Sequence, residues 1–65
     1  MAPPERVFEL ARILYEARIA EAWGSAAADR LARFPFPAHI GAERSAEVDL
    51  AIAQAKAVLQ WMQLP

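Results

Sequence analysis

Hydrophobic residues recur along the chain at intervals of three and four positions, the spacing of an α-helix that buries one face. In the first third of the chain this spacing predicts a long helix from about residue 4 to residue 23. Pro4 suits the first helical position, because a residue there needs no backbone N–H. Gly24 suits a left-handed cap just past the last turn.

A second, shorter helix is expected over residues 26–34. Ser25 precedes this helix and offers a side-chain oxygen as its N-cap. The helix must stop near Phe34, because a proline disfavours helical geometry at the residue before it. Residues 35–37 form a Pro-Phe-Pro sequence, here called the proline segment, which predicts a stiff and extended connection.

A third helix is expected over residues 43–63, with either Gly41 or Ser45 as its N-cap. No stretch alternates β-branched and polar residues, so the sequence gives no support for strands. The predicted fold is therefore all-α, a single small three-helix domain over residues 1–65. Its order is long helix, short helix, proline segment and long helix, and we expect the two long helices to lie antiparallel.

The predicted first helix carries a hydrophobic arc wider than the roughly 100° that one neighbouring element covers. The arc consists of Val7, Phe8, Leu10, Ala11, Leu14, Tyr15, Ile19 and Ala22. The polar face consists of Glu5, Glu9, Arg12 and Glu16. The arc predicts contacts with two neighbours, and Trp23 is expected to close the end of the helix against the core.

The predicted third helix carries two hydrophobic seams at heptad-like spacing, on nearly opposite sides. The first seam consists of Val48, Ile52, Ala55, Leu59 and Met62. The second seam consists of Leu50, Ala57, Trp61 and Leu64. A helix with two hydrophobic sides needs two neighbours. The first helix can cover one seam, and the other is covered either by the short helix with the proline segment or by a second protein chain.

We place the partner-binding surface on the second seam, at Leu50, Trp61 and Leu64, with Arg18 and Phe36 as neighbours. Tryptophan and arginine are enriched among residues that contribute most to binding. Trp61 also lies near the end of the third helix, where burial within the chain is hardest to complete.

Four side chains allow two interpretations each. Arg18 lies within the hydrophobic arc, and either pairs with Glu21 one turn later or contacts a partner. Phe34 and Phe36 either cover the core or present their rings to a partner. His39 is expected to be a loop residue, and the alternative is a pH-dependent or partner contact.

Length and composition favour association with another chain. A 65-residue chain buries only roughly 60% of its unfolded surface, and it has no cysteine to form disulfides. Hydrophobic residues nevertheless make up 57% of the chain, more than so small an interior readily holds. A net charge of -1 makes nucleic acid an improbable partner. We expect a cytoplasmic protein without a signal peptide or membrane span, because no apolar run approaches roughly 18 residues.

The sequence offers no pattern for catalysis, cofactor binding or metal binding. His39 is the one histidine, and the two serines, Ser25 and Ser45, are both placed at helix starts. One histidine and scattered acids do not match a metal-ligand spacing. A phosphate-binding loop is excluded because Gly24 and Gly41 are the only glycines. We therefore expect no catalytic residue, no cofactor and no metal.

Residues 10–17, followed later by Arg44-Ser45-Ala46, resemble the first helix and the return helix of small ryanodine-receptor-type domains. The chain lacks the Cys-His and Trp-Gln pairs that mark that family, so no residue role is carried over. As a compact, cysteine-free helical chain it also resembles phage-encoded inhibitors and small accessory subunits.

Two functional hypotheses follow. The first is a non-catalytic protein-binding module, with self-association as a homodimer included, that occludes or bridges a larger protein of unknown identity. The alternative is a helix-turn-helix regulator that binds DNA, with Gly24 in the turn and Arg30, Arg33 and Arg44 as contacts. Arg30 occupies a position that is normally buried and apolar in that motif, so the alternative fits poorly.

Overall fold

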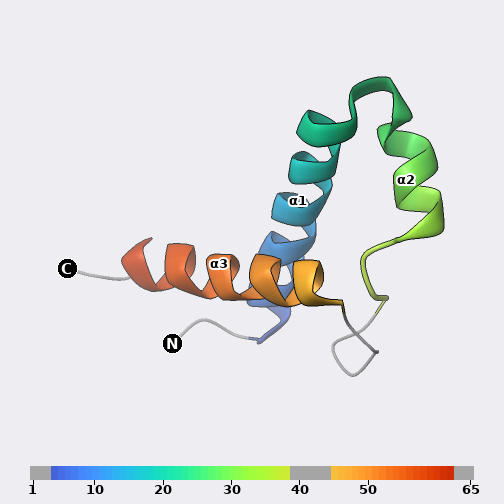
Figure 1. The fold of residues 1–65 in the computed structure, drawn as a ribbon. Helices are drawn as coiled ribbons and strands as arrows, with labels where there is room; N and C mark the ends of the chain where they lie inside the picture. Colours follow the sequence, from blue (N-terminus) through green and yellow to red (C-terminus); the bar gives the residue numbers. More distant parts are fainter. Residues whose placement is uncertain (1–3, 39–44, 63–65) are drawn as a thin grey trace.

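The fold is known from a computed structural model, which describes residues 4–38 and 45–62. The elements are α1 (Pro4–Trp23), a short 3-10 turn η1 (Gly24–Ala26), α2 (Ala27–Arg33) and α3 (Ala46–Met62). Within these ranges every regular element is helical, which confirms the all-α prediction (Figure 1).

The connection between α1 and α2 differs in part from the prediction. Gly24 has a φ of +54°, the left-handed conformation expected for a cap after α1. Ser25 does not cap the second helix, because residues 24–26 form a 3-10 turn and α2 starts only at Ala27 without a side-chain cap. The second helix ends at Arg33, and the Phe34 N–H donates to the Arg30 carbonyl at 2.9 Å.

Ser45 is the N-cap of the third helix. The Val48 N–H donates to Ser45 Oγ at 3.3 Å, and the Asp49 N–H donates to the Ser45 carbonyl at 3.0 Å. The helix therefore begins at Ala46, later than the predicted residue 43. The other candidate cap, Gly41, lies outside the described residues.

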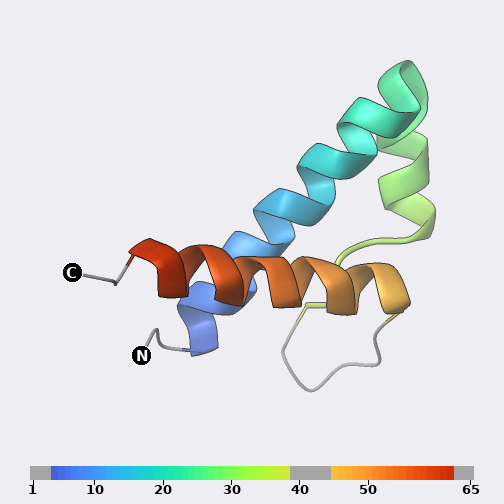
Figure 2. The ribbon, with the colours of Figure 1, turned by 60° about the vertical axis from the view of Figure 1, so that its left-hand side comes forward.

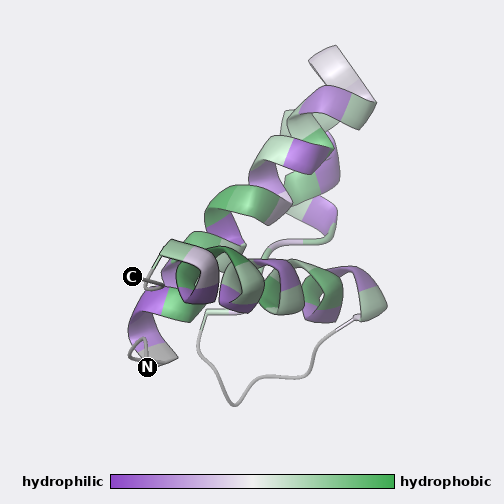
Figure 3. Ribbon diagram, turned by 90° about the vertical axis from the view of Figure 1, so that its left-hand side faces the viewer, coloured by the Kyte–Doolittle hydropathy of each residue, from purple (hydrophilic) through white to green (hydrophobic). Residues whose placement is uncertain are grey.

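The two long helices cross instead of lying antiparallel along their length (Figures 1 and 2). Small side chains lie at the crossing: Ala11 of α1 and Ala55 of α3 are both fully buried, and Ala51 is 3% exposed. Alanine at a helix contact lets the two backbones approach closely. Hydrophobic parts of α1 meet α3 at this crossing (Figure 3), which forms one half of the core.

The proline segment also packs against α1. The Phe36 ring lies 4.9 Å from the Phe8 ring and 5.5 Å from the Tyr15 ring, between ring centroids, and Phe36 is only 9% exposed. The Tyr15 hydroxyl donates to the Phe34 carbonyl at 2.7 Å. This contact holds the end of α2 and the start of the proline segment against α1.

The electrostatic surroundings of Tyr15 change its acidity. Burial raises the pKa of the Tyr15 hydroxyl above its ordinary value of 10.0, and the Glu47 carboxylate raises this pKa further. The positive charge of Arg30 acts in the opposite direction. The folded state therefore favours the protonated hydroxyl, the form that can donate to Phe34.

The molecule is elongated, with extents of 40 × 24 × 16 Å. Its Cα radius of gyration is 12.4 Å, whereas a compact domain of this length is expected to have roughly 11 Å. An elongated shape leaves more surface exposed for each buried residue.

Replacing Ile52 by alanine should lower the free energy of unfolding by about 2 to 5 kcal/mol, because Ile52 is buried at the crossing. Ile13→Ala is the matched control, since Ile13 is 56% exposed and should cost less than about 1 kcal/mol. Leu14 is half-buried, so Leu14→Ala should fall between the two. Urea unfolding measures all three, and equal losses for Ile52→Ala and Ile13→Ala would contradict this core.

Tyr15→Phe should lower the free energy of unfolding by about 1 kcal/mol at neutral pH, because the Phe34 carbonyl loses its donor. A raised folded-state pKa gives stability that is complete below about pH 10 and is lost as the pH rises through that pKa. The difference in the free energy of unfolding between the parent and Tyr15→Phe should therefore shrink as the pH rises above about 10. A difference that stays constant over this range in urea unfolding would contradict the contact.

Candidate protein-binding surface

The first seam of α3 packs against α1. Val48, Ile52 and Ala55 are buried, and Leu59 is half-buried. Met62 follows them at helical spacing but is 71% exposed, because it lies near the end of α3, which extends beyond α1 (Figure 2). α1 therefore buries only part of the first seam of α3.

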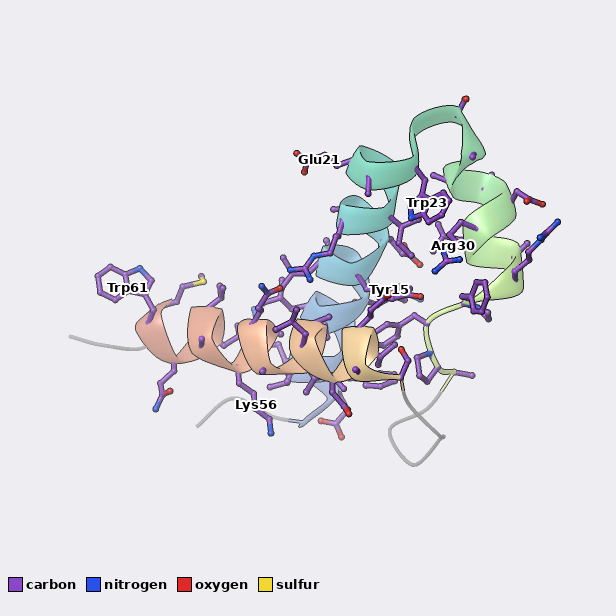
Figure 4. All side chains as sticks on the ribbon, viewed as in Figure 1. Tyr15, Glu21, Trp23, Arg30, Lys56 and Trp61 are labelled. Carbon is purple, nitrogen blue, oxygen red and sulfur yellow. The ribbon has the colours of Figure 1, made fainter. Side chains whose placement is uncertain are left out.

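The second seam is exposed along its described length. Trp61 is 74% exposed and Leu50 is 47% exposed, and Ala57 between them is also exposed. The Trp61 ring points away from the rest of the molecule (Figure 4). Leu64, also predicted for this surface, lies outside the described residues.

Arg18 contacts α3 beside the second seam. Its Nη2 donates to Gln54 Oε1 at 2.8 Å, and Arg18 is exposed. Gln54 is one turn from Leu50 on α3, so the hydrogen bond brings the guanidinium to the border of the hydrophobic seam. The predicted pairing of Arg18 with Glu21 is not formed, and Glu21 points away from α2 (Figure 4).

Phe36, predicted as a neighbour of the partner-binding surface, is buried instead. It packs against Phe8 and Tyr15, in the core cluster that also contains Val48 and Ile52 of α3. The interpretation of Phe36 as a core cover is therefore the correct one, whereas Phe34 is 51% exposed. Because the proline segment is held there, it does not cover Leu50 or Trp61.

The structure adds two residues that the sequence analysis did not place at the surface. Val58 is 40% exposed and lies one turn before Trp61, and the exposed Met62 lies one turn after Val58. Helical spacing alone could have grouped Val58 with Trp61. The exposed α3 face is defined here by Leu50, Ala57, Val58, Trp61 and Met62.

A second aromatic cluster joins the far end of α1 to α2. The Arg30 guanidinium lies 4.6 Å from the centre of the Trp23 ring and 4.2 Å from that of Phe34. Trp23 is 47% exposed, so it stacks on Arg30 at the surface instead of closing α1 against the core as predicted (Figure 4).

Two of the three arginines suggested for DNA contact are thus in contact with other side chains of this chain. Arg30 is stacked between two rings, and Arg33 forms an ion pair with Asp29 at 3.5 Å. Arg44 lies outside the described residues, as does His39. The structure therefore adds nothing in favour of a helix-turn-helix regulator.

An open cleft of about 520 Å³ lies between α1 and the proline segment. Its lining residues are Glu5, Phe8, Glu9, Arg12, Phe36, Pro37 and Ala38. In the part of the chain that the structure describes, no three acidic or histidine side chains are grouped to hold a metal ion. Over the same ranges, no helix has both the length and the apolar character needed to cross a membrane.

Comparison of the chain with protein-family models, with curated protein sequences and with solved structures gives no match. The function of the exposed α3 face is therefore inferred from its side chains and their surroundings.

Trp61→Ala should change the free energy of unfolding by less than about 0.5 kcal/mol, because the ring contacts little of its own chain. Trp23→Ala is the matched control and should cost about 1 kcal/mol, since it removes one of the two rings on Arg30. Urea unfolding with helix content followed by circular dichroism compares them. A larger loss for Trp61→Ala than for Trp23→Ala would contradict the assignment of these rings.

Proposed function

We propose that the protein is a non-catalytic interaction module that binds another protein through the exposed α3 face. It occludes or bridges its partner, as a small inhibitor or accessory subunit does. The observation that carries the proposal is the exposure of Trp61, 74%, at the end of a seam whose exposed hydrophobic residues are interrupted by Gln54.

The energy available from this face supports binding. A tryptophan side chain can bury roughly 200 Å², so covering the exposed three quarters of Trp61 yields on the order of 3 to 4 kcal/mol before the costs of association. Leu50, Val58 and Met62 add to this gain. A single tryptophan surrounded by smaller apolar contacts is the usual composition of a binding hot spot.

The shape of the face favours a helical partner. Ala57 lies between Leu50 and Trp61 and lets a neighbouring helix approach closely. Arg18 and Gln54 form a polar border on the α1 side, and the guanidinium retains further N–H groups for a partner. The complementary surface is therefore a helix with apolar residues at intervals of three and four.

Trp61→Ala should weaken binding to a captured protein partner by about 2 kcal/mol or more, a loss of roughly 30-fold in affinity. The protein is immobilised, a stoichiometric partner is isolated from a cell lysate, and its affinity is measured for each variant. Lys56→Ala is the matched control, because Lys56 lies on α3 but points away from Trp61 (Figure 4).

Equal affinities for the parent and Trp61→Ala would overturn the proposed surface. An equal loss for Lys56→Ala would mean that the substitutions act through the helix as a whole instead of through the exposed face.

A further inference from the structure

We infer that the partner on the exposed α3 face is a second copy of this chain, packed antiparallel to the first about a two-fold axis between Gln54 and Ala57. The inference rests on the proposed function and names the occupant of the same surface.

The exposed area is the first support. The chain exposes 4977 Å², whereas a compact monomer of 7.2 kDa is expected to expose roughly 4100 Å². This surplus belongs to the chain as a whole, and the exposed α3 face, with Trp61 74% and Met62 71% exposed, contributes part of it. Pairing two copies through α3 would cover that part.

The order of side chains along the seam supports self-pairing. The large residues Leu50 and Trp61 lie near its ends, and Gln54 and Ala57 lie between them. An antiparallel pair centred between Gln54 and Ala57 sets Leu50 against Trp61 of the partner subunit. It also sets Gln54 against Ala57 of the partner subunit, where the helices must come closest. One surface then supplies both halves of the contact, as a two-fold interface requires.

Charge selects the antiparallel direction. The first turn of α3 contains both Glu47 and Asp49. A parallel pair would bring these carboxylates together with their counterparts and align the two helix dipoles, whereas an antiparallel pair separates them and opposes the dipoles. The net charge of -1 for each chain adds little repulsion between two copies.

A two-fold dimer presents every other surface of the chain twice. The cluster of Trp23, Arg30 and Phe34 lies between α1 and α2, away from the exposed α3 face (Figure 4). Two copies of it would remain accessible in the dimer. Self-pairing through α3 therefore favours bridging over occlusion as the mode of action.

Sedimentation equilibrium at micromolar concentrations tests the dimer. The parent should be dimeric, Trp61→Ala should raise the dissociation constant by roughly 30-fold or more, and Lys56→Ala should leave it within a few fold. A dimer of unchanged affinity in Trp61→Ala would overturn the inference, because another surface would then hold the two copies together.

Disulfide trapping tests the direction of pairing, since the chain has no cysteine of its own. In an antiparallel pair of Ala57→Cys chains, the two introduced cysteines would be offset by roughly 4 to 5 Å along the α3 helix axis, a distance that a disulfide spans. In Ala46→Cys they would lie roughly 28 Å apart. Air oxidation should therefore link Ala57→Cys but not Ala46→Cys. Efficient linkage of both would indicate a parallel pair and overturn the inferred arrangement.

The lysate capture separates this inference from the proposed function. If the parent protein is monomeric and Trp61→Ala no longer binds the captured partner, the homodimer is overturned and the proposed function stands. A monomeric parent whose captured partner is unaffected by Trp61→Ala would overturn both.

Discussion

The hydrogen bond from the Tyr15 hydroxyl to the Phe34 carbonyl holds the proline segment against α1. This contact determines which hydrophobic side chains the proline segment covers. It fixes the end of α2 and places Phe36 against Phe8 and Tyr15. A buried tyrosine hydroxyl needs an acceptor, and the Phe34 carbonyl supplies one. The proline segment, held against α1, leaves the second seam of α3 uncovered, and Trp61 is exposed near the end of α3 that extends beyond α1 (Figure 2).

Local signals in the sequence predicted the helices and most of their faces. Pro4 and Gly24 bound α1 as expected, and proline at position 35 follows the end of α2. Spacing at three and four residues identified Val48, Ile52 and Ala55 as the buried side of α3. The same spacing separated a second hydrophobic seam from the first. These features depend on the helix period and on backbone preferences, which neighbouring residues determine.

Features that depend on contacts between distant segments were not predictable in this way. The sequence left open whether Phe36 covers the core, because the answer requires the positions of Phe8 and Tyr15. Trp23 was expected in the core, but the cation of Arg30 on the next helix provides a partner at the surface. The crossing of the long helices depends on the alanines at their contact, which permit close approach without fixing the angle.

The packing of α2, α3 and the proline segment against α1 explains why we expect another chain, and not a rearrangement of this one, to bury the exposed α3 face. The wide arc of α1 already contacts α3, the proline segment and α2. If α2 or the proline segment moved onto Trp61, Phe36 and Tyr15 would lose their cover and the Phe34 carbonyl would lose its donor. A separate chain could cover the same face without disturbing these contacts, which is why we propose that this hydrophobic surface is buried between molecules.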